Sequence, residues 1–194
     1  KYFVMDMNHV YLGICKELFP NAKPVADRFH YTRCCTEAVE AVRKRVQDSL
    51  SSKARKLFKK SRKLLLKKGC KLSPEERVAV EALIAHSEDL ARVWLLKEDF
   101  YRFLQSKGSD EAKKKLDQFC YSAKKLQLPE FEPLLKTLKN WEPYILNSFD
   151  CPYSNGFTEG TNNSIKVLKR VTYGMPNFRN FRARILHCCS KVVP

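Results

Sequence analysis

Two short apolar runs lie near the start of the chain, and a segment with a helical pattern separates them. The runs are Tyr2–Met5 and Ala22–Ala26, with the amphipathic residues 8–19 between them. Two strands joined by a helix of this length are typical of a β-α-β unit in a mostly parallel sheet. Asp6 and Asp27 directly follow the two runs. Because ligands of such sheets bind beyond the carboxyl ends of the strands, we expect both carboxylates at one edge of the sheet.

The pattern is helical from about residue 33 to residue 150, and no strand pattern interrupts it. An apolar stripe at helical spacing begins this region, formed by Ala38, Val39, Val42, Val46 and Leu50. Ser73–Glu76 then predicts a helix start, with a cap, a first-turn proline and a capping-box glutamate, before the apolar residues Val78, Val80, Leu83 and Ile84. Residues 88–105, 110–126 and 130–148 predict further helices. We therefore expect an all-helical insertion of four or five helices.

A loop rich in glycine and asparagine leads into another helical pattern at residues 154–170. At 100° per residue one polar face carries Glu159, Asn162, Asn163, Lys166 and Arg170. The other face is expected to pack through Ile165, Val167, Leu168 and Val171, and a last basic helix is expected over residues 177–189. The predicted fold class is α/β and mostly α overall. Its α/β core consists of residues 1–32 and 151–194, and the helical residues 33–150 interrupt it.

The chain is strongly basic, with a net charge of +16 and a pI near 9.6. Between Lys53 and Lys71 there are ten Lys and Arg residues and no acid, and after Glu159 there are seven more without an acid. A polyanion such as DNA or RNA is the partner that this bias favours, although a solvated helix face, an acidic protein or an anionic lipid surface would also fit it. No apolar run approaches the roughly 20 residues of a membrane span. We expect a cytoplasmic protein that does not span a membrane.

The cysteines and tryptophans are interpreted as packing residues. None of the eight cysteines forms a C-x-x-C pair, and the adjacent pairs do not fit the spacing of zinc ligands. Most are expected to be reduced thiols at helix-packing positions. Trp94 and Trp141 lie at apolar helix spacing, so core packing is favoured over stacking on a nucleic-acid base.

Three carboxylates occupy positions that suit metal-dependent phosphoryl transfer. Asp6 and Asp27 follow strands, and Glu159 lies near a helix start. Oxygen ligands of this kind bind Mg²⁺ or Mn²⁺, and two such ions activate the attacking oxygen and stabilise the leaving one. The alternative is that the two aspartates cap the helices that follow them and that Glu159 favours a helix N-terminus. Spacing alone leaves both interpretations open.

The motifs around these acids resemble a known enzyme family. Asp6 after Tyr2–Met5, Phe19–Ala22 before Asp27–His30, and Ser154–Gly156 before Glu159–Asn163 are together similar to the transposase catalytic domain of the bacterial ISL-three insertion-sequence family. The similarity continues from Ile165 to Ile185, whereas the helices between match in position and character only. The resemblance implies a ribonuclease-H-like fold with an Asp-Asp-Glu site. Two Mg²⁺ (or Mn²⁺) ions at this site would support cleavage and joining of DNA at transposon ends.

The resemblance also implies roles for individual residues. Asp6 matches the second acid and Glu159 the third, so both would bind metal. Asp27 and His30 match an acid-x-x-His motif, for which a supporting role is expected. Phosphate contacts are expected from the residues near these acids, namely Arg28, Asn162, Asn163, Lys166, Lys169 and Arg170. The partners implied are DNA and a second copy of the chain bound on it.

The family's first acid has no counterpart in this chain. In the family it lies on the first strand, which is expected to precede Lys1 in a longer parent protein. The isolated chain is therefore expected to be inactive in DNA strand transfer. The competing interpretations are a basic helical nucleic-acid-binding protein without chemistry and the remnant of a decayed element.

Overall fold

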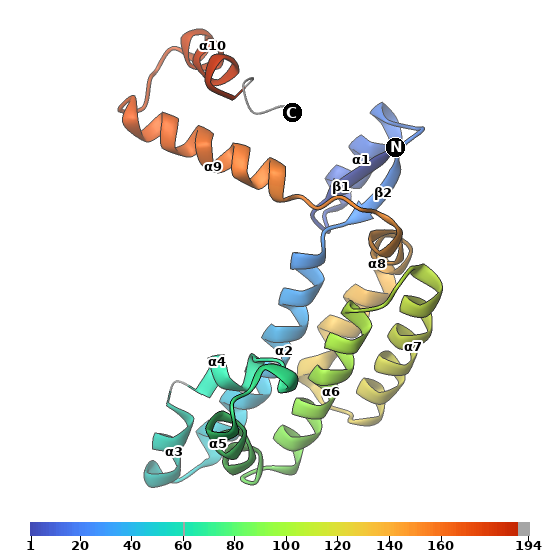
Figure 1. The fold of residues 1–194 in the computed structure, drawn as a ribbon, viewed down its shortest axis with the longest axis vertical. Helices are drawn as coiled ribbons and strands as arrows, with labels where there is room; N and C mark the ends of the chain where they lie inside the picture. The colour runs from blue at the N-terminus through green and yellow to red at the C-terminus, as the bar shows by residue number, and fades with distance from the viewer. Residues whose placement is uncertain (60, 190–194) are drawn as a thin grey trace. The chain divides into compact units, whose positions relative to one another are not determined.

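The computed structural model describes residues 1–59 and 61–189, which form two compact units (Figure 1). The first unit comprises Lys1–Pro152 and the second Tyr153–Pro194. The first unit contains β1 (Tyr2–Met5), α1 (His9–Leu18), β2 (Lys23–Ala26), α2 (Arg28–Ser49), α3 (Ser52–Phe58), α4 (Ser61–Leu66), the 3₁₀ turn η1 (Gly69–Lys71), α5 (Pro74–Ile84), α6 (Glu88–Leu104), α7 (Ser109–Lys125), the 3₁₀ turn η2 (Pro129–Phe131) and α8 (Glu132–Asp150). The second unit contains α9 (Gly156–Val171) and α10 (Phe178–Cys189).

The two predicted strands form a small parallel sheet. β1 pairs with β2 in a register that runs from Tyr2 opposite Lys23 to Met5 opposite Ala26. α1 is the crossover between them, as the sequence predicts. Asn8, rather than Asp6, caps α1, because its side chain accepts a hydrogen bond of 2.9 Å from the backbone N–H of Val10. The capping role left open for Asp6 is therefore wrong.

The sheet is attached to the helices through the end of α8. The side-chain amide of Asn147 donates to the carbonyl oxygen of Pro24 in β2 at 2.8 Å. The hydroxyls of Tyr31 and Ser148 lie 2.9 Å apart, and both side chains are buried. These bonds join residues far apart in sequence, so the sheet and the helices belong to one compact unit.

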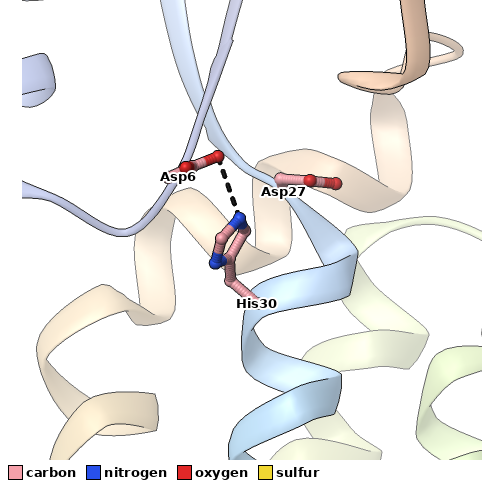
Figure 2. A group of neighbouring side chains, drawn as sticks. All are labelled: Asp6, Asp27 and His30. Carbon is pink, nitrogen blue, oxygen red and sulfur yellow. Dashed lines mark ion pairs between the residues drawn. The ribbon is translucent and has the colours of Figure 1, made fainter. Parts of the chain in front are cut away.

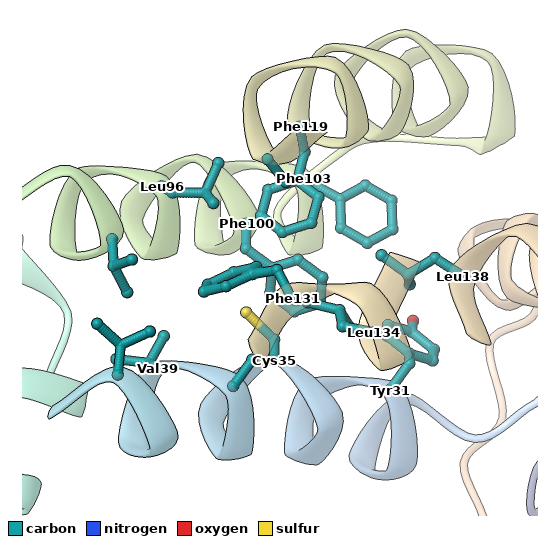
Figure 3. Close-up of a cluster of buried hydrophobic side chains, with 14 of the residues drawn as sticks. Tyr31, Cys35, Val39, Leu96, Phe100, Phe103, Phe119, Phe131, Leu134 and Leu138 are labelled. Atoms are coloured by element: carbon teal, nitrogen blue, oxygen red, sulfur yellow. The ribbon is translucent and has the colours of Figure 1, made fainter. Parts of the chain in front are cut away.

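Helices α2, α6, α7 and α8 surround a core rich in phenylalanine (Figure 3). Tyr31, Cys35 and Val39 enter it from α2, and the rings of Phe100, Phe103 and Phe119 meet at its centre. The centroids of Phe100 and Phe119 are 5.1 Å apart with the rings tilted, a geometry that aromatic pairs prefer. The apolar stripe predicted on α2 faces this core.

The structure confirms most of the predicted helix pattern, but the described part of the helical region holds seven α-helices, α2 to α8, instead of the four or five expected, because the basic segment after α2 also forms the two short helices α3 and α4. The capping box of α5 is present, with the Ser73 hydroxyl accepting from the Glu76 N–H and the Glu76 carboxylate accepting from the Ser73 N–H. Val78, one of the apolar residues predicted after this start, is 65% exposed, because α5 turns Val80 and Leu83 inward instead. Trp141 is buried and Trp94 is partly buried against the core, which confirms their packing role.

The second unit is a pair of helices without a buried residue among those described. Ile165 and Leu168 of the predicted apolar face are partly buried, but Val167 and Val171 are 55% and 66% exposed. The expected packing is thus found for only half of that face, because α10 is the single helix covering α9 within this unit.

All eight cysteines lie among the described residues and none is in a disulfide; Cys15, Cys35 and Cys151 are buried. Cys70 and Cys188 are exposed, so a packing role is wrong for these two. None of the described helices is long and apolar enough to cross a membrane. The fold is mostly helical with a two-stranded parallel sheet, which agrees with the predicted class. The ribonuclease-H-like core and its proposed boundaries stay predictions.

Candidate metal centre

Asp6 and Asp27 lie next to each other at the carboxyl ends of the paired strands. Met5 and Ala26, the residues before them, are partners in the parallel register, and the Asp27 N–H donates to the Met5 carbonyl at 2.8 Å. Parallel pairing places the ends of both strands at one edge of the sheet. The spacing of the two apolar runs therefore predicted this juxtaposition.

His30 completes a group of three side chains at this edge (Figure 2). It lies in the first turn of α2, and its Nε2 is 2.9 Å from Oδ1 of Asp6. One ligand atom each from Asp6, Asp27 and His30 can be chosen so that all three lie within 4.8 Å of one another. We call these three side chains the acid–histidine group.

The acid–histidine group is open on one side. Asp27 is only 8% exposed, whereas the side chains of Asp6 and His30 are 42% and 29% exposed. The Asp27 carboxylate also accepts a hydrogen bond of 3.5 Å from the Phe29 N–H, so Asp27 caps α2 as well. Both interpretations that the sequence left open for Asp27 are compatible, because one oxygen can cap while the other remains available.

This set of donors suits a divalent cation. Two carboxylates supply hard oxygen ligands, and the imidazole supplies one nitrogen. Mg²⁺ favours oxygen ligands, whereas Mn²⁺ also accepts imidazole. Three protein ligands on an open edge leave coordination positions for water or for phosphate oxygens. The group fits a catalytic ion better than a closed structural site.

Arg28 lies beside the acid–histidine group but is held by α8. Its guanidinium donates to the carbonyl oxygen of Ser148 at 2.9 Å and lies over the ring of Phe149, 4.6 Å from its centroid. Burial raises the pKa of the neighbouring Tyr31 to about 12, although the hydrogen bond with Ser148 lowers it. The sequence analysis did not identify Asn147 and Ser148, which anchor β2, Tyr31 and Arg28 to α8, because polar residues near a helix end carry no distinctive pattern.

The other predicted site residues lie on α9 in the second unit. Glu159 is exposed in the first turn, and Asn162, Asn163, Lys166, Lys169 and Arg170 are exposed along the helix. A groove of about 620 Å³ between α9 and α10 has a mostly apolar lining that includes Phe157, Val167 and Asn163. The structure describes the two units separately, so the meeting of Glu159 with Asp6 stays a prediction.

Known proteins that resemble this chain are transposases over most of its length. A family model described as a transposase, that of the ISL-three group with an Asp-Asp-Glu site, matches residues 1–185. The transposase for insertion sequence element IS1001 of Bordetella parapertussis is 26% identical over 188 residues, covering 95% of this chain and 46% of that protein. The transposase for insertion sequence element IS1557 of Mycobacterium tuberculosis is 29% identical over 195 residues, covering 89% and 43%.

A shorter match is to a protein of Lactococcus lactis named as an ATP-dependent protease, 45% identical over 62 residues, which is 31% of this chain and 20% of that protein. The chain spans less than half the length of each of these curated relatives. No solved structure matches. The family match extends from β1 through the acid–histidine group and α9 into α10. The chain therefore belongs to the ISL-three family of transposases.

Proposed function

We propose that the chain is part of a DNA transposase that cleaves and joins DNA at insertion-sequence ends by two-metal phosphoryl transfer. The observation that carries the proposal is the convergence of Asp6, Asp27 and His30 at one edge of the parallel sheet. Transposase relatives over most of the chain support DNA as the substrate. A divalent ion bound there would polarise a phosphate oxygen and lower the pKa of a bound water or hydroxyl.

In this proposal each residue of the acid–histidine group has a distinct task. Asp6 is the metal ligand, because its carboxylate is exposed enough to meet an ion that also contacts DNA. Asp27 is a buried positioning residue that fixes the start of α2. His30 orients the Asp6 carboxylate through the 2.9 Å contact, as outer groups of metal sites do.

Glu159 is proposed as the further metal ligand, supplied by α9. The exposed amides and cations that follow it, Asn162, Asn163, Lys166, Lys169 and Arg170, are proposed to hold phosphate oxygens near the metal ions. Arg28 is proposed to contribute its remaining N–H groups from the other side. This arrangement requires α9 to lie against the sheet in a ribonuclease-H-like core, and it is compatible with a homo-oligomer assembled on DNA.

The proposal is tested by localised cleavage of the polypeptide. Fe²⁺ replaces Mg²⁺ at such sites, and with ascorbate and peroxide it cuts the backbone near its ligands. We expect cuts near Asp6 and Asp27 and also near Glu159, all of them lost in the Asp6→Asn variant. The matched control is Asp110→Asn, which changes an exposed acid of α7. Cuts confined to one of the two regions would contradict a shared site.

The activity is tested in the full-length parent. Asp6→Asn and Glu159→Gln should each abolish metal-dependent strand transfer on a DNA substrate that carries the element's ends, whereas Asp110→Asn should retain it. That the 194-residue chain alone is inactive stays a prediction. Strand transfer by the purified chain would contradict it. A result in which the parent binds DNA but neither Asp6→Asn nor Glu159→Gln changes DNA cleavage would favour the alternative of a non-catalytic nucleic-acid-binding protein.

A further inference from the structure

Some cations of the first unit are paired with acids and others are not. The pairs on α6 and α7 include Arg92 with Glu88, Lys113 with Asp117 and Glu142, and Lys115 with Glu111, whereas Lys114 and Lys124 of α7 are exposed and form no ion pair among the described residues. Five cations on α3, on α4 and at Lys59, the residue after α3, are exposed, make no ion pair among the described residues and have no acid among them in the sequence: Lys53, Lys56, Lys59, Arg62 and Lys63. We call these five residues the basic face.

The basic face is built on a small apolar anchor. Phe58 at the end of α3 and Leu65 in α4 are each 1% exposed, and the ring of Phe58 meets His86 edge-on. The Ser61 hydroxyl donates to the Phe58 carbonyl at 2.8 Å and joins the two helices. Because these side chains point inward, the cations of both helices are left pointing into solvent.

Helix α6 holds the turn that follows the basic face through three side chains. The Lys97 ammonium donates to the Lys67 carbonyl at 2.7 Å, and the Tyr101 hydroxyl donates to the Leu66 carbonyl at 2.7 Å. The Glu98 carboxylate accepts from the Gly69 N–H at 3.0 Å. Lys97 is 1% exposed and forms an ion pair with Glu98 at 2.6 Å. A merely solvated basic helix would not require its backbone to be fixed in this way.

Helix α2 sets the distance between the basic face and the acid–histidine group. α2 starts after Asp27 and ends at Ser49, directly before α3 (Figure 1). Its 22 residues span about 33 Å at 1.5 Å per residue. That length corresponds to about ten base pairs of duplex DNA at 3.4 Å each. A duplex held at the acid–histidine group can therefore reach the basic face about one helical turn away.

We propose that the basic face binds backbone phosphates of duplex DNA flanking the bond that is cut, independently of base sequence. The choice of DNA rests on the proposed function. The cations themselves call for a dense row of negative charges, and a duplex carries one per ≈ 1.7 Å of its axis. This surface is separate from the residues proposed on α9 and Arg28.

The test is the salt dependence of DNA binding, measured in EDTA so that no metal chemistry takes part. The chain is titrated against a fluorescent duplex of 24 base pairs at several salt concentrations. In the variant Lys53→Gln, Lys56→Gln, Lys59→Gln and Lys63→Gln, the slope of log K against log salt should fall in magnitude by about 3 to 4. The matched control makes the same change at four exposed lysines of α7 and α8, Lys114, Lys124, Lys136 and Lys139, and should lower the slope by less than about 1.

Equal losses in the two variants would overturn the proposal, because the effect would then follow net charge alone. Tighter binding of a duplex RNA of the same length would overturn the choice of DNA. Circular dichroism checks that both fourfold variants keep their helices. If the variant of the basic face does not fold, two double variants replace it. They are Lys53→Gln with Lys56→Gln, and Lys59→Gln with Lys63→Gln. Because the assay contains no metal ion, its outcome is independent of the Fe²⁺ cleavage test of the proposed function.

Discussion

His30 Nε2 lies 2.9 Å from Asp6 Oδ1, which ties the first turn of α2 to the end of β1. The contact joins two elements that a full crossover helix separates in sequence. It also occupies one of the two carboxylate oxygens of Asp6. A metal bound at Asp6 thus depends on a side chain carried by the helix that leads away from the sheet.

Replacing His30 by Gln should weaken Mn²⁺ binding about tenfold, because the Asp6 carboxylate loses the group that orients it. Binding is measured from the loss of the free-ion electron paramagnetic resonance signal. His187→Gln, in α10, is the matched control and should leave the affinity unchanged. Unchanged affinity in the His30 variant would remove this residue from the centre.

Two substitutions at Asp27 should separate its capping of α2 from its contribution to metal binding. Asp27→Asn keeps a side chain that caps well, so the free energy of unfolding should change by less than about 0.5 kcal/mol while Mn²⁺ affinity falls. Asp27→Ala should lower both, with a loss of about 1 kcal/mol in unfolding free energy. Urea denaturation and Mn²⁺ titration of the same samples check this. Equal stability of the Asn and Ala variants would contradict the capping role.

Glu98→Ala should destabilise the first unit by about 3 kcal/mol, because it leaves the Lys97 ammonium buried without its carboxylate. Burial already lowers the pKa of Lys97, and Glu98 opposes that shift. The change also removes the acceptor of the Gly69 N–H. Urea denaturation followed by tryptophan fluorescence measures the loss in unfolding free energy. The control Glu81→Ala, at an exposed acid of α5, should lower the unfolding free energy much less.

Tyr31 should make stability fall at alkaline pH. Its pKa is raised to about 12 in the folded chain by burial, so the folded state keeps a proton that the unfolded state releases near pH 10. The stabilisation is therefore complete below pH 10 and is lost as the pH rises to about 12, by an amount of about 2 to 3 kcal/mol. Tyr31→Phe should remove this part of the pH dependence, whereas the control Tyr121→Phe, at an exposed tyrosine, should leave it unchanged. Parallel pH profiles for wild type and Tyr31→Phe would contradict it.

The sequence predicted most of the elements and the meeting of Asp6 with Asp27 because both depend on local patterns, whereas His30 was expected at the site only from the family resemblance. Strand runs ending in aspartate, followed by a helix start, bring Asp6 and Asp27 together whenever the strands pair in parallel. The burial of Lys97 had no such signal. In the sequence of α6 it is one cation among others, and its contact with the Lys67 carbonyl depends on a turn far away in the chain. The exposure of Val78 was missed for a similar reason, because which side of a short helix faces the core depends on neighbours distant in sequence.

Pro24 decides which edge of the two-stranded sheet can pair with a further strand. A proline has no N–H to offer another strand, and its carbonyl oxygen already accepts from Asn147 of α8. Proline in sheets is confined to outer strands, so β2 is the closed side of this pair. Any further strand must then be added beside β1, on the flank away from α8. In any larger sheet built this way, β1 and the Asp6 that follows it would lie in the interior of the sheet rather than at its margin.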